Sequence, residues 1–226
     1  MRVMIALVLL CAVLPALADP EPKPATSSPA TAISLPADGD DYSRMVAQAA
    51  AHDPATDFRA LRFAWLDNKA RGRHPKVSLN MDTTAIQEAA QARNNQLVRD
   101  RAITVLSKEY TNVRAQSYLG AACEILNDTP CTEQATFVGR GLVQSILRSG
   151  DGKTCETGWE VAMVREEYDL LRIMGTRPKQ QALIMGKDGG HSCDAMTVIE
   201  RDGKETTYYF TIDRVMADEM KMLKIK

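Results

Sequence analysis

Apolar positions along the chain follow two different periods, and the change comes near Ser149. From Asp41 to Leu147, apolar residues recur every three or four positions, which is the spacing of helices buried on one side. After Ser149, short runs rich in β-branched and aromatic residues alternate with two helical stretches. The order of helices first and strands later predicts an α+β fold.

The first part of the chain predicts a series of antiparallel helical hairpins. Tyr42, Met45, Val46 and Ala49 share one stripe of the first helix, which Asp53-Pro54 ends. Further helices are expected over 56–68, 83–110 with an interruption at Asn94-Asn95, 113–126 and 132–149. Short turns between such helices favour antiparallel packing. Small residues in the last two helices allow a close approach: Ala115, Gly120, Ala121, Ala122, Ala135, Gly139 and Gly141. The packing resembles that of tetratricopeptide hairpins, although the sequence has no 34-residue repeat.

The second part predicts a small antiparallel sheet with a helix before it and a helix at the end. Strands are expected over 158–164, 181–186, 193–200 and 205–213, and helices over 165–175 and 214–225. Asp202-Gly203 supplies the positive backbone angles of a tight hairpin turn between the last two strands. The final helix carries four apolar residues on one side, Val215, Met216, Met220 and Leu223.

The N-terminus has the pattern of a secretory signal peptide. Arg2 precedes an apolar run over 3–14, and Ala16-Leu17-Ala18 forms a small-residue cleavage site. The run is too short to span a bilayer. Residues 19–40 are rich in Pro, Ala, Ser and Thr, which predicts a flexible linker. We therefore expect a periplasmic protein, cleaved after Ala18, with a helical module over 41–148 and an α+β module over 149–226.

The charge balance excludes some classes of partner. The chain has 28 basic and 29 acidic residues and a formal net charge of −1. Such a balance gives no field of one sign to attract nucleic acid or anionic lipid. We therefore expect neither of these as a partner.

Four cysteines follow the predicted signal peptide, Cys123, Cys131, Cys155 and Cys193. An even number in an exported chain favours disulfides, with three possible pairings. A bridge between Cys123 and Cys131 would pin one helical hairpin and add about 2–3 kcal/mol. Zinc is the rival interpretation, but the chain has no C-x-x-C pair and only His191 lies close by, so no metal is expected.

The stretch Gly152-Lys153-Thr154 has the last three letters of a nucleotide-binding P-loop. That motif needs a glycine five positions before Gly152, where this chain has Leu147, and it needs a strand before the loop rather than a helix. Gly150 or Gly152 instead suits the end of a helix, with Asp151 forming a local turn. Asp151 and Glu156 are too few ligands for a calcium loop. No cofactor is therefore expected.

A catalytic set could be drawn from His191 and Asp194, with Asp151 or Glu167 nearby. Paired carboxylates could also come from Glu166, Glu167, Asp169, Asp194 and Asp213. Ser192 is badly placed as a nucleophile beside His191, and there is no Gly-x-Ser-x-Gly elbow. Acids at 166 and 167 have a structural explanation, because they complement a helix dipole from a surface turn. The sequence therefore assembles no catalytic site.

Several stretches resemble one family of exported bacterial proteins that is catalogued only as a domain of unknown function. "SGDGKTCETGWEVAMVREEYDLLRIMG", followed by "QAL", "GHSCD" and "YYFTID", resembles its C-terminal signature. "DFRALRFAW", "TVLSKEYTNVRAQSYLGAACEIL" and "GLVQSILRSGDGK" are similar to its helical part. The resemblance covers 57–213 and implies export, but it brings no established activity.

Two cysteines depart from the family pattern. Cys155 stands where a proline or small residue is usual, and Cys193 stands where an aromatic residue usually precedes the Asp. Both departures place a thiol in the same module. The resemblance to the family therefore implies a Cys155–Cys193 bridge, which leaves Cys123 to pair with Cys131.

These observations predict a non-catalytic periplasmic protein that binds a partner protein in the cell envelope, because stacked helical hairpins commonly present concave surfaces. One version is an immunity protein or inhibitor that acts against a toxin or hydrolase. The alternative is a small hydrolase that uses His191 and Asp194. A further alternative is an envelope scaffold or small-ligand carrier, which would need a deep apolar pocket.

Overall fold

The computed structural model describes residues 32–36, 39–70, 79–187 and 189–222. They belong to one compact unit that begins at Thr31. The predicted signal peptide, most of the predicted linker and Leu223 lie outside these residues, and the side chain of Met220 is not described. No described helix is long and apolar enough to cross a bilayer.

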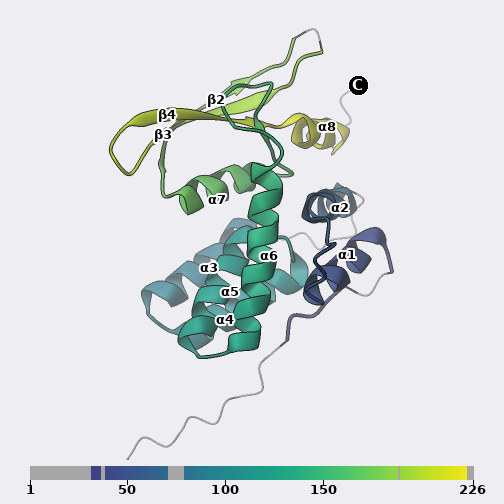
Figure 1. Ribbon diagram of the computed structural model, residues 1–226, viewed down its shortest axis with the longest axis vertical. Helices are drawn as coiled ribbons and strands as arrows, with labels where there is room; N and C mark the ends of the chain where they lie inside the picture. The colour runs from purple at the N-terminus through teal and green to yellow at the C-terminus, as the bar shows by residue number, and fades with distance from the viewer. Residues whose placement is uncertain (1–31, 37–38, 71–78, 188, 223–226) are drawn as a thin grey trace, which may run out of the picture. The chain divides into compact units, whose positions relative to one another are not determined.

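The elements follow the predicted order, with helices first and a sheet later, so the fold is α+β (Figure 1). They are α1 (Asp41–Ala50), α2 (Phe58–Ala70), α3 (Leu79–Gln91), α4 (Asn95–Lys108), α5 (Val113–Ile125), α6 (Thr129–Leu147), β1 (Trp159–Glu160), α7 (Val164–Met174), β2 (Arg177–Ile184), β3 (Cys193–Ile199), β4 (Glu205–Thr211) and α8 (Asp213–Met222).

Short polar side chains mark where the central helices begin. Asn94, Asn112 and Asp128 each accept a hydrogen bond from a backbone N–H in the first turn of α4, α5 and α6. The long helix expected over 83–110 is therefore two helices, interrupted at Asn94 as the sequence indicates. α6 starts three residues earlier than predicted, because Pro130 occupies the first turn, where its missing N–H costs nothing.

Small residues bring α5 and α6 close together. A Cβ on Gly120 would lie 3.6 Å from the Cβ of Ala135, and one on Gly139 would lie 3.5 Å from the Cβ of Gln116. These are ordinary van der Waals contacts, so alanine would fit at either position, whereas a side chain that extends beyond Cβ would meet the facing helix. The interface contributes Leu119, Ala122 and Cys123 to the core of the helical part.

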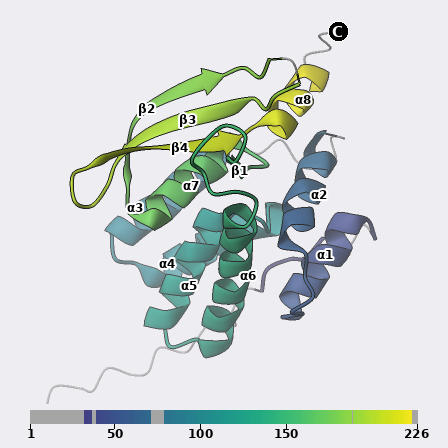
Figure 2. The same ribbon diagram turned by 45° about the horizontal axis from the view of Figure 1, so that its top comes forward.

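The sheet is mixed, which corrects the prediction of an antiparallel sheet. Its order is β1-β4-β3-β2, with antiparallel pairing of β2 to β3 and of β3 to β4 (Figure 2). β1 pairs with β4 in parallel, Trp159 opposite Phe210. Two adjacent strands can be parallel only when a longer connection separates them, and here the chain passes through α7, β2 and β3 between β1 and β4. Leu170 and Leu171 of α7 pack with Met196, Val198 and Phe210 of the sheet.

The "SGDGK" stretch folds into a tight loop over Trp159. The indole Nε1 donates to the carbonyl of Gly150 at 3.1 Å, and the Asp151 carboxylate accepts from the Thr157 hydroxyl at 2.6 Å. Gly152 has a φ of 68°, and a Cβ there would lie 2.8 Å from the indole ring. The loop follows a helix and leads into a strand, the reverse of the order around a P-loop.

Both disulfides join the pairs that the departures from the family pattern favour. Cys123 is bonded to Cys131 across the turn between α5 and α6. Cys155 is bonded to Cys193, which ties the loop over Trp159 to the first residue of β3.

Candidate functional site

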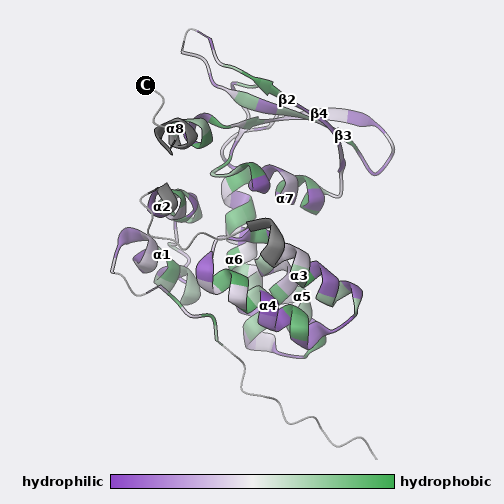
Figure 3. Ribbon diagram, turned by 180° about the vertical axis from the view of Figure 1, so that it is seen from behind, coloured by the Kyte–Doolittle hydropathy of each residue, from purple (hydrophilic) through white to green (hydrophobic). Residues whose placement is uncertain are grey.

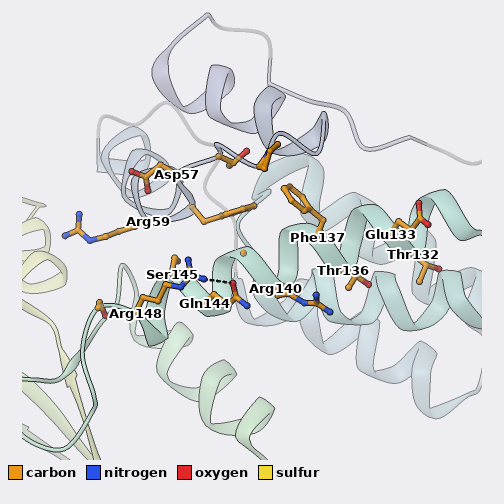
Figure 4. Close-up of a pocket in the computed structure, with 15 residues that line it drawn as sticks. Asp57, Arg59, Thr132, Glu133, Thr136, Phe137, Arg140, Gln144, Ser145 and Arg148 are labelled. Atoms are coloured by element: carbon orange, nitrogen blue, oxygen red, sulfur yellow. Dashed lines mark hydrogen bonds between the residues drawn. The ribbon is translucent and has the colours of Figure 1, made fainter.

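A groove of about 780 Å³ runs along α6, with residues 54 and 56–59 as its other wall (Figure 4). The α6 residues that line it lie on one stripe: Thr132, Glu133, Thr136, Phe137, Arg140, Gly141, Gln144 and Ser145. Arg148 and Ser149, just beyond the helix, also line it. At 1.5 Å per residue, the stripe from Thr132 to Ser145 is about 20 Å long. The volume lies in the range of ligand sites, and the length suits an extended chain.

The floor of the groove is aromatic. Phe58 meets Phe137 edge to face, with ring centroids 5.6 Å apart, and the ring centroid of His52 lies 5.1 Å from that of Phe137. Phe58 lies directly against Gly141, since a Cβ there would come within 2.2 Å of its ring. The glycine therefore lets an aromatic side chain from α2 lie on the surface of α6.

The rim carries more basic than acidic side chains. Arg59, Arg140 and Arg148 line the groove together with Asp57 and Glu133. Arg140 makes no ion pair within the described part of the chain, and Arg148 donates to Gln144 at 3.3 Å. Arg59 holds Glu160 through two hydrogen bonds of 2.6 and 2.8 Å. The groove therefore offers guanidinium donors to a carboxylate of a ligand.

Beneath the groove, a fully buried ion pair connects α2 to α7. Arg62 Nη1 lies 2.6 Å from Glu166 Oε2, and both side chains are enclosed. Arg62 Nε also donates to Ser145 at 2.9 Å, and Glu166 accepts from the backbone N–H of Ala162 at 2.7 Å. Arg62 thus reaches from α2 to α6 and α7 at once.

A second set of ions connects α7 to the ends of α4 and α5. Arg165 donates to Glu109, and Asp169 accepts from Arg114 at 2.7 Å. Burial raises the pKa of Glu109, and the positive charge of Arg165 opposes that rise. α7 therefore carries charges of both signs into the contact with the helical part.

Glu167 faces the sheet, where its neighbour is Asp194. Neither oxygen of Glu167 has a hydrogen-bond donor among the described residues, while Asp194 accepts from Gln181 at 2.7 Å. Burial, and then the negative charge of Asp194, raise the pKa of Glu167 to about 9. Glu167 is therefore protonated at neutral pH and can donate its proton to Asp194.

The expectation that Glu166 and Glu167 lie on a surface turn is wrong. Both are buried: the first forms an ion pair with Arg62, and the second lies beside Asp194. They do lie in the first turn of α7, where acids complement the helix dipole.

Glu167 should make the protein less stable as the pH rises. The unfolded chain loses this proton near pH 4.5, whereas the folded protein keeps it up to about pH 9. Between these values the unfolded state binds fewer protons, so the free energy of unfolding falls with rising pH. Glu167→Gln removes the titration and keeps the shape. From pH 6 to pH 8.5, the urea midpoint should decrease more in the wild type than in this variant. An equal decrease in both proteins would contradict the raised pKa of Glu167.

His191 forms a hydrogen-bonded pair with Asp213 rather than with Asp194. Its Nδ1 lies 2.6 Å from Asp213 Oδ2, and the other oxygen of Asp213 accepts from the Ser192 backbone N–H at 2.8 Å. The pair lines a cavity of about 180 Å³ together with Ser149 and Glu156.

The four residues proposed for a catalytic set do not gather at one place. Asp151 binds Thr157 in the loop over Trp159, and Asp194 binds Gln181 beneath the sheet. Neither is hydrogen-bonded to His191 within the described residues, and Glu167 meets Asp194 alone. Of the expected neighbours, the structure brings together only Glu167 and Asp194.

One group of three possible metal ligands occurs among the described residues, Cys123, Asp128 and Cys131. The two sulfurs are bonded to each other, so neither is a thiolate. Asp128 caps α6 and lies 3.0 Å from Arg99. These atoms are therefore already engaged in holding the hairpin.

Sequence reasoning missed the groove, the ions under it and the pairing of Asp213 with His191. The run "VREEYDLL" has a signal, because three acids and an arginine fall on a short helix whose apolar residues must be buried. On an eleven-residue helix that packs on both sides, some of these charges have to enter the interior.

No curated protein and no solved structure matches the chain. A family model described as "Domain of unknown function (DUF4919)" matches residues 51–221, which include the groove, the buried ions and the whole sheet. The chain therefore belongs to the DUF4919 family.

Proposed function

We propose that this is an exported, non-catalytic binding protein whose α6 groove takes an acidic segment of a partner protein. The observation that carries the proposal is the placement of Arg140, which has no ion pair within the described residues, beside the aromatic floor of Phe58 and Phe137. One version is an immunity protein or inhibitor that acts in the periplasm.

Two features support export. The N-terminal residues have the charge, apolar run and cleavage pattern of a signal peptide. The two disulfides are compatible with an oxidising compartment.

The groove suits a segment of protein better than a compact small molecule. It is long and open, and hydroxyl and amide side chains such as Thr136, Gln144 and Ser145 are spaced along it. Such donors and acceptors can satisfy the backbone of an extended peptide, while the phenylalanines hold one apolar side chain.

The test places a photo-crosslinking amino acid at Thr136, inside the groove, in cells that export the protein. A matched position is Arg101, which is exposed on α4 outside the groove. We expect an adduct with one protein from Thr136 and none from Arg101. With that protein purified, Arg140→Glu should weaken binding at least tenfold and Arg101→Glu should leave it unchanged. An affinity for this partner that is the same in Arg140→Glu as in the wild type would overturn the proposal.

A second candidate is a small hydrolase, which the His191–Asp213 pair beside Ser149 favours. A carboxylate on one imidazole nitrogen orients the ring so that the other nitrogen can act as a base. Turnover of an ester panel that is equal in the wild type and in His191→Ala would count against it.

A further inference from the structure

β2 is the outermost strand of the sheet, and its only neighbour among the described strands is β3 (Figure 2). All eight of its residues are exposed. An edge strand carries a row of backbone N–H and C=O groups that can pair with another chain.

The first half of β2 has the features that protect an edge from pairing. Pro178 has no N–H, the register with β3 shifts between Pro178 and Gln180, and Lys179 pairs with Glu205. A proline, a bulge and a lysine are the usual devices that block a further strand.

The second half has none of these features. Leu183 and Ile184 at its end and Met185 just after it are 57%, 41% and 53% exposed. The end of β2 is correspondingly green in the hydropathy view (Figure 3). On the outer edge of β2, one half is therefore protected against pairing and the other is apolar and unprotected. An exposed apolar patch of this kind is typical of a surface that a partner covers.

Charge favours a foreign partner over a second copy. β2 contains Arg177 and Lys179 and no acid, and Arg177 has no ion pair within the described residues. A two-fold pairing of β2 with itself that matches all eight residues would place Arg177 opposite Ile184. That arrangement sets a guanidinium against an apolar side chain and doubles the positive charge of the edge.

We propose that the outer edge of β2 binds an extended, acidic and apolar segment of a partner protein as a fifth strand. The segment pairs with the unprotected second half of β2 and places apolar side chains beside Leu183 and Ile184. Its unpaired continuation passes the protected half and brings a carboxylate to Arg177. Main-chain hydrogen bonds hold it, and the side chains select it. This surface is built from β2 alone and does not depend on the α6 groove.

The test selects twelve-residue peptides from a random phage library against the disulfide-bonded protein, followed by affinity measurements with the synthetic peptides. We expect acidic, apolar sequences. Ile184→Lys should weaken their binding at least tenfold, because a lysine blocks the edge. The matched control is Ile125→Lys, which changes an equally apolar residue that is 62% exposed at the end of α5. It should leave binding unchanged, as should Arg140→Glu in the groove.

Hydrogen exchange of the wild type gives a measurement that needs no variant. Bound peptide should slow exchange of amides within 181–185 and leave α6 unaffected. Three results would each overturn the proposal. The peptides could bind equally well to Ile184→Lys, they could contain no acidic residues, or the wild type could form a dimer that Ile184→Lys dissociates.

Discussion

Replacement of Arg62 by methionine is expected to lower the free energy of unfolding by about 3–5 kcal/mol. Arg62 is fully buried and lies 2.6 Å from Glu166, which is buried as well. Methionine fills similar space but carries no charge, so the carboxyl group of Glu166 is left in the interior without its partner. Urea denaturation at pH 7 measures the loss.

Two controls separate this effect from a general loss of arginine. Arg44→Met breaks an exposed pair with Asp41 and should change stability by about 0.5 kcal/mol or less. The double change Arg62→Met with Glu166→Leu should recover much of the loss, since no uncompensated charge then remains. A double variant no more stable than Arg62→Met would show that packing, and not charge, explains the loss.

Loss of the Cys155–Cys193 bridge should be the second large effect. Its cysteines are 38 residues apart, and the chain-entropy relation gives about 4 kcal/mol for a loop of this length. The Cys123–Cys131 bridge spans 8 residues and should contribute about 2–3 kcal/mol. Paired Cys→Ser variants, compared in urea, test the order; a larger loss from the shorter loop would contradict it.

The helical part was largely predictable, because its signals are local. Tyr42, Val46 and Ala49 are all buried on one side of α1, as their spacing indicates. The interruption near Asn94 and the turn at Gly203 each depend on residues within a few positions. Local rules of this kind need no knowledge of the rest of the fold.

The features that were missed depend on residues far apart in the sequence. Arg62 and Glu166 are separated by 104 positions, and Arg114 and Asp169 by 55. Nothing near Glu166 in the sequence indicates that an arginine from α2 will reach it. The same holds for His191, whose carboxylate partner lies 22 residues on at Asp213 instead of three residues on at Asp194.

The buried ions between the helices and α7 also bear on how the gene can be divided. The helical part supplies Arg62, Arg114 and Glu109, and α7 supplies their counterions Glu166, Asp169 and Arg165. A fragment that stops after α6 would keep charged side chains without their partners. A chimera that joins these helices to the sheet of a relative would pair them with the wrong partners. The two parts should therefore be inherited and exchanged as one piece, and a fragment expressed alone should be insoluble or unfolded.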